Sequence, residues 1–190
     1  MSGPGAVQEF ETARPLAEDL ARSIPEASRS LTLTWQDPVA SAARGMELSG
    51  LDYMRAVTSG EIPPPPIAVL LDMAPIEIEE GRVVFGGKPG EEHYNPIGVV
   101  HGGYAATILD SALGCSVQTT LEKGTAYTSL GLEVKYVRPI TRDTGYVLCE
   151  SKVTFRGRRQ ATAEAHLKSA GTGKLLASGT TTCLIMGPPA

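Results

Sequence analysis

The chain has 190 residues, enough for one domain with a sizeable core and an appendage. Hydrophobic residues make up 42% and charged residues 20% of the chain, the proportions of an ordinary soluble globular protein. The net charge of −4, with no basic run in the sequence, excludes the electrostatic footprint of a nucleic-acid-binding surface.

The cysteine and histidine residues show neither disulfide nor metal-binding patterns. Cys115, Cys149 and Cys183 are odd in number and far apart, without a C-x-x-C pair, which fits a reducing cytoplasm. His93 and His166 lack ligand spacing, so we predict no metal. The N-terminus lacks the basic head and apolar core of a signal peptide, and no apolar run approaches the roughly 18 residues of a membrane span. We therefore expect a cytoplasmic protein with no membrane partner.

The first third of the chain carries weak patterns. Residues 1–30 are rich in Ala, Gly, Pro, Ser and acidic residues and are predicted to be a mobile tail, with one candidate helix at 15–22. Residues 31–62 form a predicted N-terminal extension. Within it, 31–36 is a candidate strand, and the apolar residues of 49–60 recur at the spacing of a short helix.

Four consecutive prolines at 63–66 interrupt regular structure and mark the predicted start of the main domain, residues 63–188. The segment 74–89 reads as two short strands around a turn at Gly81, and a long helix at 101–121 follows. The next four segments are rich in β-branched residues or alternate in polarity: 126–137, 145–156, 159–169 and 175–186. This order predicts an α+β domain, an antiparallel sheet packed on one principal helix.

In the strand 126–137, alternation places Leu130, Leu132, Val134 and Tyr136 on one face and the intervening residues on the other. The helix that precedes this strand is apolar nearly all round, so we expect it to be buried on most sides.

Asp110 is the only charged side chain between His101 and Glu122. An ionised carboxylate in apolar surroundings is costly unless its desolvation is offset, and such a residue can be tuned to act as a base. The alternative is a structural carboxylate satisfied by Thr or backbone donors. Small residues on its face, including Gly103 and Gly114, leave room for another backbone or a thin ligand.

The residues before Asp110 suit a site for a polarised carbonyl. The first turn of a helix has free N–H groups and a partial positive charge, and Gly102 and Gly103 would let a substrate approach that backbone closely. Tight packing against a sheet is the other explanation for the two glycines. Asn95 is a turn initiator whose amide could also donate to a substrate oxygen, and His101 either lines the site or fixes the preceding loop.

These residues form a spaced pattern that is more specific than any one of them: Asn95-x-x-Gly98-x-x-His101-Gly102-Gly103, with Asp110 nine residues after His101. The pattern resembles the hotdog-fold acyl-CoA thioesterases of the phenylacetate-degradation (PaaI-like) group. The segments "YTSLGLEVKYVRP", "FRGRRQATAEAHL" and "GKLLASGTTTCLI" are similar to that family in the same order, so the resemblance covers about residues 63–187.

The resemblance implies a hotdog fold, in which an antiparallel sheet of about six strands wraps around the long helix, assembled as a homodimer or a dimer-of-dimers tetramer. It also implies hydrolysis of an acyl-CoA thioester to a free acid and coenzyme A. Carried over residue by residue, Asn95 and the amide of Gly102 hold the thioester carbonyl, and Asp110 is general base or nucleophile. The catalytic hydroxyl falls on Ser129, with the adjacent Thr128 as the alternative if the strand slips by one residue.

The arginines 156, 158 and 159 surround Gly157 in a predicted hairpin. A solvated turn is the ordinary explanation, but coenzyme A carries phosphates that arginine binds well, and the resemblance favours Arg158 for that role. Together with Arg158, the residues expected to contact the substrate are His101, Gly103 and Thr128. No separate cofactor is implied, because coenzyme A is part of the substrate.

Two other functions compete with hydrolysis. One is a hotdog-fold dehydratase or hydratase, which the Asn–His-Gly-Gly–Asp pattern disfavours. The other is a non-catalytic acyl-CoA-binding module, which gains nothing from a costly carboxylate at Asp110. The sequence leaves the acyl group open, because the shape of its tunnel depends on side chains from several strands.

Overall fold

The computed structural model of the chain describes residues 29–187, and the fold lies in the compact unit that begins at Thr34. Residues 1–28 of the predicted tail, with the candidate helix at 15–22, lie outside the described residues. The prediction of a strand at 31–36 was wrong, since this stretch has no regular structure. Alternation alone does not make a strand, which also needs a hydrogen-bonded neighbour, and this segment pairs with none. The predicted domain boundary at residue 63 stays a prediction.

From residue 29 onward, three short helices precede the sheet: α3 (Pro38–Gly45), α4 (Gly50–Ser59) and α5 (Pro66–Leu70). Helix α4 confirms the helix predicted at 49–60. Helix α3 was missed, although Asp37 caps it and Pro38 occupies its first turn, which are recognisable start signals. The prediction that the four prolines end all regular structure was wrong. The last of them begins α5, because a missing N–H is no loss in the first turn of a helix.

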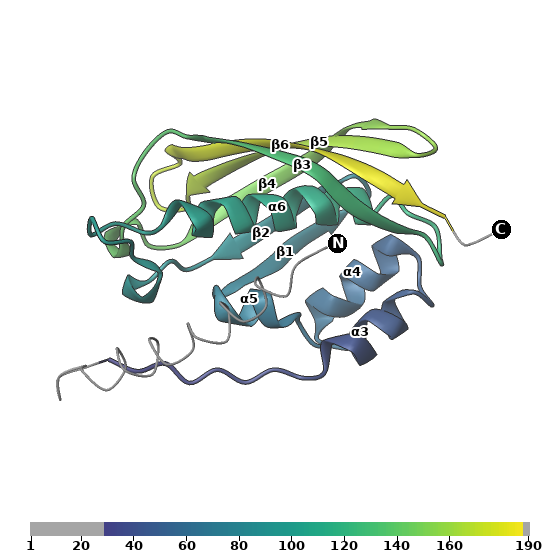
Figure 1. Cartoon of the computed structure of the whole chain (residues 1–190), viewed down its shortest axis with the longest axis horizontal. Coiled ribbons are helices and arrows are strands. Elements are labelled where there is room, and N and C mark those ends of the chain that lie inside the picture. Colours follow the sequence, from purple (N-terminus) through teal and green to yellow (C-terminus); the bar gives the residue numbers. More distant parts are fainter. Residues whose placement is uncertain (1–28, 188–190) are drawn as a thin grey trace, which may run out of the picture. The chain divides into compact units, whose positions relative to one another are not determined.

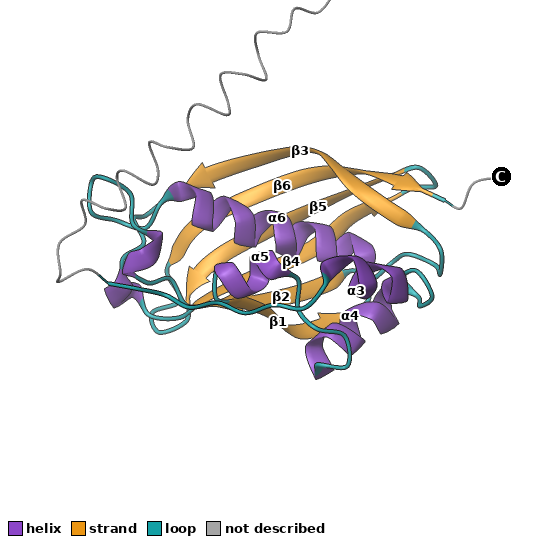
Figure 2. Ribbon diagram, turned by 60° about the horizontal axis from the view of Figure 1, so that its bottom comes forward, coloured by secondary structure: helices purple, strands orange, loops and turns teal. Residues whose placement is uncertain are grey.

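The predicted antiparallel sheet is confirmed, with six strands in the order β1-β2-β4-β5-β6-β3. The strands are β1 (Met73–Glu79), β2 (Arg82–Gly87), β3 (Ala126–Tyr136), β4 (Val147–Arg156), β5 (Gln160–Ser169) and β6 (Leu175–Met186). Single 3₁₀ turns, η1 (Glu91–His93) and η2 (Arg142–Thr144), lie in the connections. Figures 1 and 2 show the strands curving over one long helix, as the α+β prediction requires.

The long helix α6 (Gly102–Gln118) packs along the inner side of the sheet and contacts its strands. Its sheet-facing side chains, such as Ile108 and Leu109, are fully buried in the core. The opposite side, with Thr107 and Asp110, is only partly buried. In the single chain α6 is therefore buried on its sheet-facing side and partly buried on the other, and Gly103 is its one exposed residue.

Strand β3 forms one edge of the sheet and contains a β-bulge. Ser129 pairs with Cys183 and Gly131 pairs with Thr182, which leaves Leu130 as the extra residue. The bulge reverses the alternation, so odd-numbered residues face α6 before it and even-numbered residues face α6 after it. Leu130, predicted to share a face with Leu132, Val134 and Tyr136, is instead the unpaired residue of the bulge, and it is 63% exposed.

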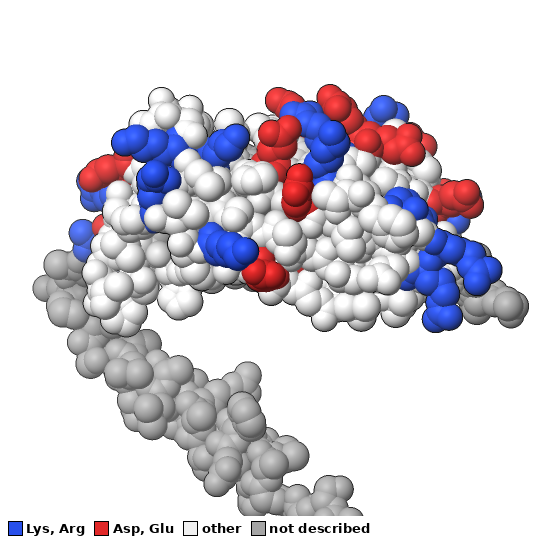
Figure 3. Space-filling model, turned by 90° about the horizontal axis from the view of Figure 1, so that it is seen from above, with Lys and Arg blue, Asp and Glu red and all other residues white. Residues whose placement is uncertain are grey.

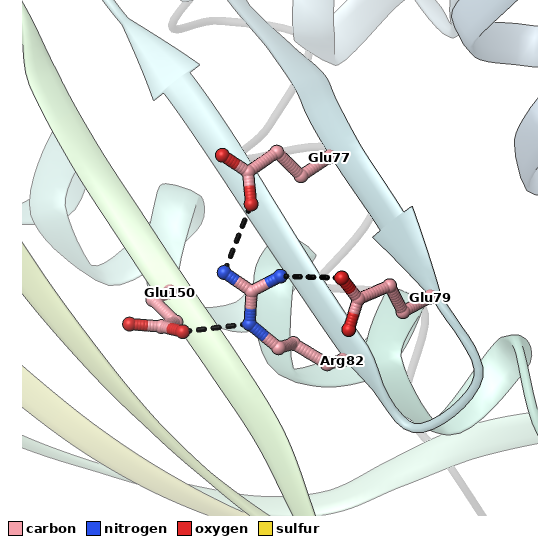
Figure 4. Close-up of polar contacts among 4 residues, drawn as sticks. All are labelled: Glu77, Glu79, Arg82 and Glu150. Atoms are coloured by element: carbon pink, nitrogen blue, oxygen red, sulfur yellow. Dashed lines mark hydrogen bonds and ion pairs between the residues drawn. The ribbon is translucent and has the colours of Figure 1, made fainter.

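The outer face of the sheet carries charges of both signs, interspersed in the view from above (Figure 3). Arg82 joins three strands through carboxylates: it donates to Glu77 at 2.9 Å and to Glu150 at 2.7 Å, and it pairs with Glu79 at 3.3 Å (Figure 4). Hydrogen bonds to Glu150 and Glu77 raise the pKa of the Arg82 guanidinium, and the bond from Arg82 lowers the pKa of Glu150.

Among residues 29–187, no helix combines the length and hydropathy needed to cross a membrane. Cys115, Cys149 and Cys183 are free thiols. The cytoplasmic location stays a prediction.

Candidate active site

Asp110 lies midway along α6, and its carboxylate reaches the neighbouring strand. The Ser129 hydroxyl donates a hydrogen bond to Asp110 Oδ1 at 3.2 Å. Thr128 pairs with Leu184 and therefore points to the other face of the sheet, because the bulge falls after Ser129 and not before it. Of the two hydroxyls left open by the sequence, the structure brings Ser129 to Asp110.

Asp110 and Ser129 line a cavity of about 220 Å³. The other walls come from α4, the segment Pro64–Ala68 and the strands β1 and β2, and they are mostly apolar. Burial raises the pKa of the Cys115 thiol to about 12, with the charge of Asp110 adding to the effect. Burial also raises the pKa of Tyr127. Both groups therefore stay protonated at neutral pH, and Asp110 is the only acidic or basic side chain in the lining.

The start of α6 leaves one backbone donor unused. His101 is the N-cap residue: its Nδ1 accepts from the Gly103 N–H at 2.8 Å, and its carbonyl accepts from the Tyr104 N–H at 3.0 Å. Within the described residues the Gly102 N–H has no acceptor. The side chain of His101 thus caps the helix, and Gly102 supplies a free donor at the positive end of the helix.

Gly102 and His101 line a second cavity of about 290 Å³. The Tyr136 hydroxyl donates to the Gly102 carbonyl at 3.1 Å, and a Cβ on Gly102 would lie 3.1 Å from the Tyr136 ring. Glycine therefore lets the ring lie against the first turn. Arg138 also lines this cavity and donates to the Leu175 carbonyl at 2.7 Å. Sequence analysis missed this cation, although it directly follows the predicted strand 126–137.

Asn95 is held in the loop before α6. Its Oδ1 accepts from the N–H groups of Ile97 at 3.1 Å and Val99 at 3.3 Å. The His101 N–H donates to the His93 carbonyl at 2.7 Å and closes this loop beside the helix. Because Oδ1 is fixed by two backbone donors, the amide Nδ2 of Asn95 is left as a donor without an acceptor among residues 29–187. Asn95 is thus a turn residue that still presents an N–H₂ group.

The predicted site residues do not all meet within one chain. Gly102 and Asp110 are eight residues apart on α6, roughly 12 Å along the axis, and they line different cavities. Arg158 lines neither cavity. Its hairpin is anchored past the end of α6, where the Arg156 Nε donates to the Thr120 hydroxyl at 3.2 Å. The described part of the chain therefore places the carboxylate and the free backbone donor in two separate cavities.

Comparisons with known proteins agree with this architecture. Residues 97–176 match the Thioesterase superfamily. Acyl-coenzyme A thioesterase 13 of Homo sapiens is 32% identical over 99 residues, which are 52% of this chain and 69% of the human protein. The structure of a phenylacetic acid degradation-related protein from Ralstonia eutropha JMP134 superimposes with a TM-score of 0.64 at 28% identity, covering 70% of this chain and 98% of that one. The Escherichia coli PaaI protein shares the fold at 18% identity, with a TM-score of 0.63 and coverage of 74% and 97%.

Proposed function

The chain belongs to the thioesterase superfamily, in its PaaI-like hotdog-fold group, and from this premise we propose that it hydrolyses acyl-coenzyme A thioesters to a free acid and coenzyme A. Membership confirms the predicted family, fold and enzyme class, a thioester hydrolase. The observation that carries the proposal is the Asp110 carboxylate, hydrogen-bonded by Ser129 on the wall of an otherwise uncharged cavity. A carboxylate in that setting is suited to activate water or to attack a thioester.

In the proposed reaction, the thioester carbonyl carbon lies beside Asp110. As general base, Asp110 takes a proton from water while the water oxygen bonds to the carbonyl carbon. The carbon–sulfur bond then breaks, and the coenzyme A thiolate leaves and takes up a proton. As nucleophile, Asp110 would itself bond to the carbonyl carbon and expel the coenzyme A thiolate, which forms an anhydride that water then opens to the free acid and the Asp110 carboxylate. Single turnover in ¹⁸O-labelled water separates the two routes, because only the anhydride route can place the label in Asp110.

The Gly102 N–H and the Asn95 amide are proposed to stabilise the oxyanion. Both are donors without an acceptor within residues 29–187, and Gly102 lies at the positive end of α6. Such preorganised donors strengthen their hydrogen bonds as negative charge develops on the carbonyl oxygen. They have no role in binding a neutral apolar molecule.

The site is proposed to be shared between two chains. Because Gly102 and Asp110 line different cavities, an antiparallel partner helix would bring its own first turn to this Asp110. Two features support a partner: the partly buried side of α6, and the apolar edge strand β3, where Leu130 is 63% and Tyr136 is 60% exposed. A dimer of dimers is the larger assembly that the family resemblance implies.

Coenzyme A phosphates are proposed to bind arginine. Arg158 is the candidate from the resemblance, and it lies on an exposed hairpin. Arg138 is a second candidate, because it lines the same cavity as the Gly102 amide. Its guanidinium has further N–H donors beyond the one used on Leu175.

The decisive experiment measures thiol release from a panel of acyl-CoAs. We expect Asp110→Asn and Asp110→Ala to keep the fold and oligomer but to lose at least about 100-fold in kcat, the scale of a missing general base. Asp143→Asn, at an aspartate whose side chain is 90% exposed, is the matched control and should keep full activity. Near-normal turnover in folded Asp110→Asn would make Asp110 structural. Binding without thiol release in wild type would favour a binding module, and hydration of an unsaturated acyl-CoA would favour a hydratase.

A further inference from the structure

The cavity beside Asp110 has a chemical character that bears on the substrate. Its volume of about 220 Å³ lies between the roughly 150 Å³ of a cavity that holds benzene, with six heavy atoms, and the roughly 300–1,000 Å³ of pockets for drug-sized ligands. Among its lining residues Asp110 is the only acidic or basic one, and no lysine, arginine or histidine is present. Within the described residues of this chain, the space is therefore small, mainly apolar and without a cation.

One wall of this cavity is held firmly in place. The Gly50 N–H of α4 donates to the Leu121 carbonyl at 2.8 Å, and a Cβ on Gly50 would lie 1.7 Å from the Gln118 carbonyl oxygen. After α4, Ile62 is fully buried and its N–H donates to the Ala56 carbonyl at 3.0 Å. These contacts fix α4 against the end of α6. The depth of the cavity is therefore set by the structure and not by a loose flap.

Resting on the proposed function, we infer that this cavity is the acyl pocket, that it accepts uncharged acyl groups of up to about eight heavy atoms, and that Val57 on α4 limits their length. A carboxylate at the far end of the acyl group would be buried against mainly apolar walls with no cation from this chain, which makes it costly. A long chain would exceed the available volume. Each methylene that enters the pocket contributes about fourfold to kcat/KM, the equivalent of 0.8 kcal/mol.

The length limit is tested with straight-chain acyl-CoAs from two to sixteen carbons. For wild type, kcat/KM should rise to a maximum between four and eight carbons and fall beyond it. Val57→Phe fills the pocket and should lower kcat/KM for octanoyl-CoA at least about 10-fold relative to butyryl-CoA. Val57→Ala should move the maximum to a longer chain by one or two carbons. Val39→Phe and Val39→Ala are the matched controls, because Val39 on α3 is 75% exposed and lines no part of the cavity. Both should keep the chain-length profile of wild type.

The charge requirement is tested by comparing pentanoyl-CoA with succinyl-CoA, whose acyl groups are similar in size. We expect kcat/KM for succinyl-CoA to be at least about 100-fold lower, because its terminal carboxylate finds no cation in the pocket. Comparable rates for the two substrates would overturn the inference.

The two proposals fail in different ways. Absence of thiol release from every acyl-CoA would overturn the proposed function, and the acyl pocket with it. Thiol release with one chain-length profile shared by wild type and both Val57 variants would leave the hydrolase standing and refute the acyl pocket. A preference for fourteen or sixteen carbons in wild type would refute the size limit.

Discussion

The Ser129–Asp110 hydrogen bond allows a sharp test of the site. Ser129→Ala removes the only hydroxyl that the structure places on the Asp110 carboxylate within residues 29–187. A hydrogen bond to a charged group contributes about 1.5–3 kcal/mol, and the length of 3.2 Å is beyond the usual range for hydroxyl donors, so we take the lower half of that range. Only the part of this energy that is gained in the transition state affects the rate, so the expected loss in kcat/KM for thiol release is at most about 10- to 40-fold.

Thr128→Ala is the matched control, because Thr128 is exposed and points to the opposite face of β3. It should change kcat/KM less than about threefold, and thermal unfolding of both variants should stay close to that of wild type. Equal losses in the two variants, or a larger loss in Thr128→Ala, would contradict the orientation set by the bulge at Leu130. An unchanged rate in Ser129→Ala would show that Asp110 works without this partner.

Three further outcomes are expected. The Asp110→Ala and Asn95→Ala proteins, each inactive alone, should recover roughly a quarter of wild-type activity when they are refolded together. About half of random dimers are mixed, and each mixed dimer has one intact site of two. Verified mixed dimers without activity would refute the shared site. Arg158→Ala should raise KM for coenzyme A thioesters several-fold but leave small thioesters without the nucleotide unaffected, and equal effects on both would make the arginine structural. Because Arg82 lowers the folded-state pKa of Glu150, that carboxylate stabilises the fold above its unfolded pKa and ceases to do so as the pH falls through its lower folded pKa. Urea unfolding at pH 7 and at about pH 3.5 should therefore show that the free energy of unfolding falls less in Glu150→Gln than in wild type. The difference should be less than about 1 kcal/mol, because the pair is partly exposed. Identical decreases in the two proteins would contradict this linkage.

The order of elements could be predicted from the sequence because it depends on local pattern. Alternation, β-branched residues and the turn at Gly81 predicted the strands, helical spacing predicted α4, and a long apolar stretch predicted α6. The spaced residues from Asn95 to Asp110 were sufficient for the family, because glycine at a helix start and a lone carboxylate within an apolar helix are visible without coordinates. Even the missed helix α3 had a local signal, an Asp cap followed by proline.

Other features were decided only by tertiary structure, because they depend on which backbone atoms face one another. A single extra residue at Leu130 determines that Ser129 and not Thr128 faces Asp110, and alternation alone cannot locate a bulge. His101 accepts a hydrogen bond from the Gly103 N–H and leaves the Gly102 N–H free within the described residues. Which of the two N–H groups stays free is decided only when the loop folds. The acyl pocket combines α4, the proline segment, three strands and α6, which are far apart in sequence. Its volume follows from how these elements pack. The sequence by itself therefore predicted the role of Asp110 but not the size of the acyl group that the pocket accepts.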